Sequence, residues 1–203
     1  SFPRGFQDAD IKVNGKEYLD EALSKKRGVI LVTGHFGVWE IMLAWFGINN
    51  YSMLAVGQKQ KNSGADTFVN QKRDNIGIKM IPRKSSLKLM YKALAKNNIL
   101  TLASDQDAKK RGIFVKFFSL PASTPKGAAR FHLENGSPLI FVTCHLKKQN
   151  IHVLDILPIP TNSNSNIKSI TQSFTLMLEK IITDHPEQYF WFHRRWKTKQ
   201  TQS

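Results

Sequence analysis

The sequence predicts a single α/β domain in which a mixed, mostly parallel central sheet is flanked by helices. Short apolar segments alternate with amphipathic segments along the chain, and the apolar runs are typical of strands buried between two layers of helices. The length of 203 residues suits one domain with a substantial core. Because no repeat, low-complexity tract or linker divides it, we treat residues 1–203 as one unit.

The first half of the chain contains three expected helices and three expected strands. Residues 15–28 have apolar side chains at helical spacing and end at Gly28, so they predict a helix. The run 29–33 is a short apolar strand, 38–48 a mostly buried helix, and 52–56 a second strand. Ser63 and Asp66 have capping-box spacing for a helix over 62–77, before a strand over 78–81.

The second half continues this alternation. Residues 85–97 have apolar residues on one face and lysines on the other, which predicts an amphipathic helix. Strands are expected over 99–104 and 113–118. Thr124 as the N-cap, Pro125 at the first helical position and Gly136 at the end then predict a helix. Neighbouring strands over 138–146 and 151–157 precede a helix over 167–183 and a closing aromatic-basic segment.

The net charge of +15 is unusual for such a composition. It favours an anionic partner. The charge alone does not decide whether this partner is nucleic acid, anionic lipid or an acidic protein. Residues 57–98 contain ten basic and two acidic side chains, which suits docking to an acidic carrier protein or an anionic membrane, or merely solubility. The basic residues are spread over several elements without a stacking platform or zinc knuckle, so we do not expect nucleic acid.

The single cysteine, Cys144, excludes an intrachain disulfide, and its apolar surroundings predict a buried structural thiol in a reducing compartment. No apolar run approaches the roughly 18–20 residues that span a bilayer. The sequence starts abruptly at SFPRGFQDAD, and a missing upstream membrane segment and a soluble protein without one are both left open.

The segment GHFGVWE carries the strongest indication of chemistry. His35 directly follows the strand over 29–33, at the end of a strand where α/β proteins tend to place their sites, and Gly34 and Gly37 permit a tight turn. Glu40, in the first turn of the next helix, is expected to reach back to one imidazole nitrogen. The other nitrogen would then take a proton from a hydroxyl, as a general base. Because histidine–acid spacing also arises by chance, packing without chemistry is the alternative.

Four ordered blocks, covering about residues 28–197, resemble one known family. TGHFGVWE is similar to the His-x4-acid box of the bacterial lipid A biosynthesis acyltransferases, the lauroyl and myristoyl transferases, which belong to the wider glycerolipid acyltransferase fold. KNSGADTFVNQKRDNIGIKMIPR resembles the second block of that family. LTLASDQDAKKRGIFVKFFSLPASTPKGAA and PEQYFWFHRRWK resemble its Asp-Gln segment and its closing signature.

This resemblance implies transfer of a fatty acyl chain from acyl carrier protein, or less commonly coenzyme A, to a hydroxyl of a membrane lipid or glycolipid. It implies that His35 is the general base and Glu40 its partner, without a covalent acyl-enzyme and without a cofactor beyond the acyl thioester. Arg73 is the first candidate for stabilising the oxyanion or holding a substrate phosphate. The expected location is the cytoplasmic face of the bacterial inner membrane, with peripheral membrane contact.

Other residues are candidates for substrate binding. Arg194 and Arg195, among aromatic residues, suit a phosphate clamp or a solvated basic face. Thr124 and Lys126 open a helix that could hold an anion or simply be capped. Asp105 and Gln106 follow a strand end and suggest a positioning role; a metal is not expected because no second carboxylate cluster supports one.

The chain departs from the family pattern after its second strand. Where many members have Tyr-Arg-Pro, it has Gly57-Gln58-Lys59, so a phosphate-binding arginine is absent unless Lys59 or Lys61 replaces it. Two alternatives to the acyltransferase remain: a thioesterase-like hydrolase that activates water with the same dyad, and a non-catalytic basic domain that binds lipid or nucleic acid.

Overall fold

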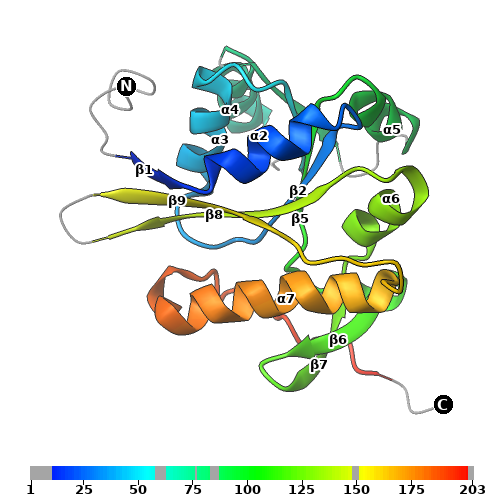
Figure 1. The fold of residues 1–203 in the computed structure, drawn as a ribbon. Helices are drawn as coiled ribbons and strands as arrows, with labels where there is room; N and C mark the ends of the chain where they lie inside the picture. Colours follow the sequence, from blue (N-terminus) through cyan, green and yellow to red (C-terminus); the bar gives the residue numbers. More distant parts are fainter. Residues whose placement is uncertain (1–10, 58–62, 76, 83–86, 148–150, 201–203) are drawn as a thin grey trace.

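The computed structural model describes residues 11–57, 63–75, 77–82, 87–147 and 151–200. Its core is a seven-stranded sheet with the strand order β1-β9-β8-β2-β5-β3-β4 (Figure 1). Strands β8 and β9 pair antiparallel and every other neighbouring pair is parallel, which confirms the predicted mixed, mostly parallel sheet. The strands are β1 (Ile11–Asn14), β2 (Val29–Thr33), β3 (Met53–Gly57), β4 (Ile78–Pro82), β5 (Ile99–Ala103), β8 (Leu139–Leu146) and β9 (His152–Pro158).

Helices cover both faces of this sheet, as the alternating pattern predicts (Figure 1). All five residues of β2 are buried, because alternate side chains enter two separate cores. Ile30 and Val32 pack with one set of helices, α5 (Leu87–Ala95), α6 (Gly127–Asn135) and α7 (Ile167–Asp184). Val29 and Leu31 pack on the opposite face with α2 (Lys16–Ser24) and α3 (Trp39–Ile48). Helix α4 (Ser63–Asp74) lies beside α3 and contacts β4.

The order of the parallel strands brings distant segments to one edge of the sheet. Strand β5 lies between β2 and β3, and Thr33 at the end of β2 is in register with Ala103 at the end of β5. The residues that directly follow β2 and β5 therefore emerge side by side. This edge is where α/β sheets ordinarily bind their ligands.

Strands β6 (Ile113–Phe117) and β7 (Leu120–Thr124) form a separate antiparallel hairpin outside the central sheet. Its two-residue turn, Phe118 and Ser119, has φ angles of 48° and 64°. A turn with two positive φ angles matches the twist of a hairpin and is usually built from Asn-Gly. For most other residues the left-handed conformation costs about 1–2 kcal/mol of conformational energy. The strand expected over 113–118 therefore exists, but in this hairpin.

Two expectations from the sequence are wrong at this point of the chain. Thr124 is not an N-cap, because the pairing of β7 with β6 continues to Thr124. Helix α6 begins at Gly127, with Lys126 as its N-cap, so Pro125 also precedes the helix. The strand β1 was not expected, since its four residues carry only two apolar side chains.

The segment after α7 returns across the edge of the sheet that carries the carboxyl ends of β2 and β5. It includes the 3-10 turn η3 (Pro186–Gln188) and runs as an irregular chain to residue 200. The side chain of Gln188 both donates to and accepts from the backbone of Leu146, at distances of 2.9 Å and 2.8 Å. These bonds fix the segment against the end of β8.

Cys144 is buried in β8, as predicted, and burial raises the pKa of its thiol to about 12, which leaves it inert near neutral pH. Within the described part of the chain, no helix combines the length and the apolar character that crossing a bilayer requires.

Candidate active site

His35 lies in the turn between β2 and α3, and this turn is held on two sides. The backbone N–H of Val38 donates to the carbonyl of Cys144 at 2.7 Å, and that of Gly37 donates to the carbonyl of Gln188 at 2.8 Å. Gly37 has a φ of 61°, and a Cβ there would lie 2.0 Å from the carbonyl oxygen of Cys144. Only glycine allows this approach, so the tight turn after His35 depends on Gly37 because the backbone of β8 lies against it.

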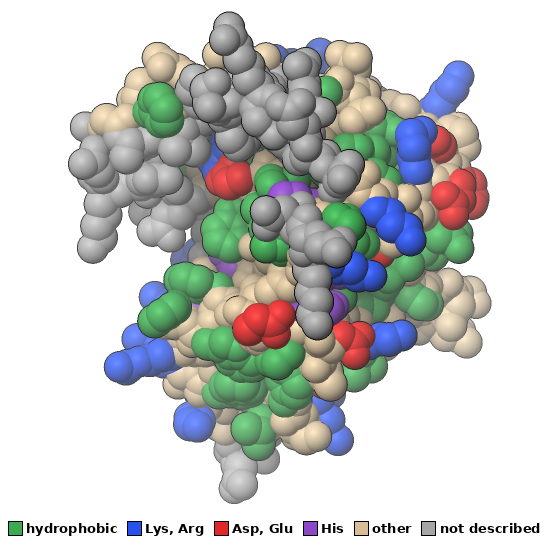
Figure 2. Space-filling model, turned by 90° about the vertical axis from the view of Figure 1, so that its left-hand side faces the viewer, with side chains coloured by type: hydrophobic (Ala, Val, Ile, Leu, Met, Phe, Trp, Pro, Cys, Tyr) green, Lys and Arg blue, Asp and Glu red, His purple; other side chains and the backbone are tan. Residues whose placement is uncertain are grey.

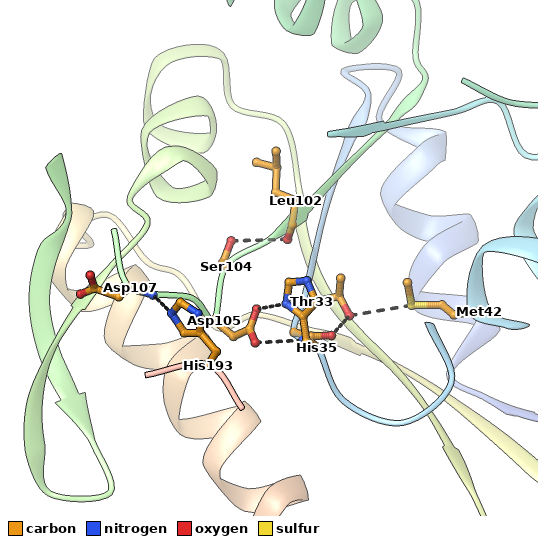
Figure 3. A network of polar contacts seen from close by, with 9 residues as sticks. Thr33, His35, Met42, Leu102, Ser104, Asp105, Asp107 and His193 are labelled. Atoms are coloured by element: carbon orange, nitrogen blue, oxygen red, sulfur yellow. Dashed lines mark hydrogen bonds and ion pairs between the residues drawn. The ribbon is translucent and has the colours of Figure 1, made fainter. Parts of the chain in front are cut away.

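The imidazole of His35 is oriented by Asp105, which directly follows Ser104 at the end of β5 (Figure 3). Nδ1 of His35 lies 2.8 Å from Oδ1 of Asp105, and the backbone N–H of His35 donates to Oδ2 at 3.0 Å. Asp105 is 3% exposed, so the pair lies largely out of water. The two residues are 70 positions apart in sequence and meet because β2 and β5 are parallel neighbours.

The expected contact between Glu40 and His35 is therefore corrected. Glu40 accepts hydrogen bonds from Arg73, from Nε at 3.2 Å and from a second guanidinium nitrogen, so the carboxylate of Glu40 is paired across α3 and α4. Glu40 follows His35 by five residues, which is why the sequence predicts it as the partner. The carboxylate that contacts Nδ1 instead belongs to Asp105, which follows β5. Asp105, expected to position substrate, occupies the place that had been assigned to Glu40.

Burial and Asp105 act on His35 in opposite directions. Burial lowers its pKa, whereas the hydrogen bond and the charge of Asp105 raise it, and the net result is a pKa above the ordinary value of 6.5. A raised pKa makes the imidazole a stronger base. About a third of the side chain stays exposed, between the rings of Trp39 at 5.7 Å and Phe190 at 6.3 Å.

A second set of side chains surrounds Asp105 from the C-terminal segment. The buried phenol of Tyr189 has a pKa raised by burial and by the nearby negative charge of Asp105. Nε2 of His193 accepts the backbone N–H of Asp107 at 2.8 Å, and burial lowers the pKa of His193, so its ring is held neutral (Figure 3). Neither residue is among the site residues predicted from the sequence. Their only signal was membership of the closing PEQYFWFHRRWK block.

A cavity of about 390 Å³ opens beside His35, between the sheet and helices α3 and α4. Its floor is made by small residues of two neighbouring strands, Ala55 and Gly57 of β3 and Thr101 and Ala103 of β5. Met42, Leu43, Met80 and Ile81 line it with apolar side chains, whereas Asn70 and Arg73 stand among its polar lining residues. A mostly apolar pocket of this size, with a few convergent polar groups, suits a small or elongated ligand.

Of the other predicted binding residues, those that the structure describes lie outside this cavity lining. Arg195 is 2% exposed, donates to the carbonyl of Ser123 at 2.7 Å and to the hydroxyl of Thr124, and lies over the ring of Phe117. Its guanidinium is buried and two of its nitrogens bond to β7, so Arg195 is not on the surface where a phosphate clamp was expected, and that prediction is corrected. Arg194 and Lys126 are exposed.

Gln106 is half-buried next to Asp105. Lys59 lies outside the described residues. Among the residues that the structure describes, no group of three or more histidine, cysteine or acidic side chains could hold a metal ion.

Comparison with known proteins identifies a family for this arrangement. Residues 6–198 match the family described as bacterial lipid A biosynthesis acyltransferase. The lipid A biosynthesis lauroyltransferase of Escherichia coli (strain K12) is 30% identical over 192 residues, which is 93% of this chain and 62% of that protein. A phosphatidylinositol mannoside acyltransferase of Mycobacterium tuberculosis (strain ATCC 25618 / H37Rv) is 22% identical over 191 residues, 92% of this chain and 60% of that protein.

A third relative, the lipid A biosynthesis palmitoleoyltransferase of Escherichia coli (strain K12), is 29% identical over 194 residues. It too is covered over only 61% of its length, so the chain spans about three fifths of the relatives it matches. The family match covers nearly the whole chain and includes both strand ends that carry His35 and Asp105. The chain belongs to the bacterial lipid A biosynthesis acyltransferase family.

Proposed function

We propose that this protein is an O-acyltransferase that moves a fatty acyl chain from an acyl thioester to a hydroxyl of a lipid or glycolipid. The observation that carries this proposal is the imidazole of His35, held at Nδ1 by a buried carboxylate at the mouth of a mostly apolar cavity. A histidine in this setting is suited to remove a proton from a hydroxyl group.

His35 and Asp105 divide the work of the proton transfer. Asp105 fixes the ring and stabilises the imidazolium that forms, while Nε2 is left to accept the proton. The hydroxyl oxygen of the acceptor attacks the thioester carbonyl carbon, a carbon–oxygen bond forms and the carbon–sulfur bond breaks. The proton taken by His35 then passes to the departing thiolate, so that no acyl-enzyme is needed.

The cavity beside His35 is the proposed site of the acyl chain. Its small floor residues and apolar walls give a chain room along the sheet face, with the thioester end at His35. Arg73 lines the same cavity, held by its ion pair with Glu40. We therefore assign Arg73 to the oxyanion or to a substrate phosphate, and Glu40 to keeping Arg73 in place.

The donor is proposed to be an acyl group on acyl carrier protein or coenzyme A, since the chain has a net charge of +15 and both carriers are acidic. The acceptor is proposed to be an anionic lipid or glycolipid reached by peripheral contact, at the cytoplasmic face of the inner membrane. Names of relatives that act on lipid A and phosphatidylinositol mannoside support a lipid acceptor.

Thiol release with and without acceptor separates this proposal from the hydrolase alternative. We expect an acyl carrier protein thioester to be cleaved by the full chain at least about tenfold faster when a membrane lipid extract is present. His35→Ala should remove the acceptor-dependent rate. His132→Ala is the matched control, because His132 lies on α6 and its Nδ1 is paired with the carbonyl of Ser137. Equal cleavage without acceptor would identify a hydrolase and overturn the proposal.

A further inference from the structure

A band of exposed apolar side chains extends from the candidate active site to the tip of the β6–β7 hairpin. We name it the apolar rim and define it by five residues: Phe118, Leu120, Phe190, Trp191 and Phe192. Phe192 is 91% exposed, Leu120 56%, Trp191 47% and Phe190 42%. Figure 2 shows hydrophobic side chains gathered on the lower part of one face, at the level of α7 and the hairpin, with basic side chains to its sides and below and acidic side chains along its upper edge.

Ring contacts make this band continuous. The ring of Phe190 lies 6.3 Å from that of His35 and 5.7 Å from that of Phe192. The ring of Trp191 lies 6.4 Å from that of Phe118, which adjoins Leu120 across the hairpin turn. A surface that meets the apolar rim would therefore also meet the mouth of the cavity at His35.

The hairpin tip carries an unusual residue for its conformation. Phe118 has a φ of 48°, where asparagine or glycine is favoured and a bulky side chain is strained. The strained residue is also an aromatic one that stays half-exposed, next to the exposed Leu120. One side of the Phe118 ring packs on the core, 4.8 Å from the ring of Phe117, while the rest of Phe118 and the neighbouring Leu120 stay accessible to an apolar partner outside the protein.

Charge and chemistry favour a lipid bilayer as that partner. Exposed basic residues lie on the elements that carry the rim or contact it: Lys116 on β6, Lys180 on α7, which packs against β6, and Arg194 and Lys197 in the C-terminal segment. Aromatic side chains flanked by basic ones are typical of the boundary between lipid headgroups and acyl chains. Trp191 already donates its indole N–H to the carbonyl of Pro186 at 2.7 Å, so its polar atom is satisfied within the protein.

We propose that the apolar rim inserts into an anionic bilayer surface, so that the mouth of the His35 cavity faces the lipid from which the acceptor enters. The choice of a bilayer over a protein partner rests on the proposed function, in which the acceptor is a lipid. The rim supplies apolar insertion and the bordering lysines and arginines supply attraction to anionic headgroups.

Vesicle sedimentation tests this with the full chain and no acyl donor. The vesicles contain equal parts of phosphatidylglycerol and phosphatidylcholine, and the variant is Phe118→Asn/Leu120→Ser/Phe192→Ser. Asparagine keeps the positive φ of the turn, and none of the three residues contacts His35 in the described structure. We expect the variant to bind about tenfold more weakly or worse, since burying each apolar side chain is strongly favourable.

Leu133→Ser is the matched control, because Leu133 is 46% exposed but lies on α6, outside the rim. It should bind vesicles like the wild type, and urea denaturation should show that all variants remain folded. Quenching of tryptophan fluorescence by lipids brominated in the acyl chain should fall in the rim variant and persist in Leu133→Ser.

Equal vesicle binding by the wild type and the rim variant would overturn the proposal, as would failure of the wild type to bind vesicles at all. The latter result would assign the rim to a protein partner. Neither result bears on the proposed acyl transfer itself, which is measured with a detergent-solubilised acceptor. Conversely, rim-dependent binding without any acyl transfer would overturn the proposed function and leave the membrane surface in place.

Discussion

At the scale of single residues, the position of one carboxylate decides how the candidate site works. Asp105 accepts both the side chain and the backbone N–H of His35, at 2.8 Å and 3.0 Å, while Glu40 is paired with Arg73. His35 and its glycine turn could be predicted from GHFGVWE alone. The partner could not, because it depends on which strand lies beside β2, and local spacing instead favoured the acid nearest in sequence.

Asp105→Asn should separate the roles of the two acids through the pH dependence of kcat/KM. A general base must be neutral, so the rate falls as the pH drops through the pKa of His35, which Asp105 raises. Without the negative charge of Asp105, burial alone acts on His35 and lowers its pKa. The acid limb of the pH profile should therefore move to lower pH, while the maximal rate falls by about 100-fold or more.

Glu40→Gln provides the comparison, because Glu40 contacts Arg73 and not the imidazole in the described structure. It should lower the rate without moving the acid limb. If instead the limb shifts in Glu40→Gln and stays in place in Asp105→Asn, the orienting carboxylate is Glu40 as the sequence spacing suggested.

Thr101→Val tests a buried hydroxyl on the cavity floor. Oγ1 of Thr101 is buried and has no hydrogen-bond partner among the described residues. Because an unpaired buried hydroxyl is costly, valine of the same shape should raise the free energy of unfolding by about 1 kcal/mol. Urea denaturation measures this, and a loss of stability would show that the hydroxyl has a partner such as a buried water.

At the scale of elements, periodicity identified most of the sheet and its covering helices, and it was weakest where pairing overrides local signals. The sequence around Thr124 looks like a helix start, yet hydrogen bonding to β6 keeps it in a strand. The run 113–118 was apolar enough for a strand, but periodicity could not say that its partner is β7 and not the central sheet. Long-range pairing of this kind is not encoded in a short window.

Two glycines on different elements should respond oppositely to alanine. Gly37 in the β2–α3 turn has a positive φ and its Cβ would meet the Cys144 carbonyl, so Gly37→Ala should cost about 3 kcal/mol of stability and displace His35. Gly127 in α6 has open space around a Cβ, so Gly127→Ala should gain about 0.5–1 kcal/mol.

Thermal or urea unfolding of both variants, with acyl transfer measured in parallel, checks this pair. A Gly37→Ala protein of unchanged stability and activity would mean that the turn is not held against β8 as the structure has it.

At the scale of the whole molecule, the net charge of +15 acts over distances that individual contacts do not reach. The composition gives this charge directly, but it does not identify the partner that the charge attracts. If it attracts an acidic carrier protein, raising the salt concentration should weaken kcat/KM with that donor by about tenfold.

The control for this measurement is an uncharged acyl thioester of a small thiol, whose kcat/KM should change by less than about twofold over the same range of salt. Equal salt dependence of the two donors would assign the positive surface to something other than the carrier protein, such as the anionic membrane.

The most direct measurement follows an isotope-labelled acyl chain. The full chain is incubated with a labelled acyl carrier protein thioester and a membrane lipid extract, and the products are analysed by mass spectrometry. We expect a labelled lipid ester with the wild type and with His132→Ala, and a loss of at least about 100-fold with His35→Ala. A folded His35→Ala protein that forms the ester at the wild-type rate would contradict the assignment of His35 as the general base.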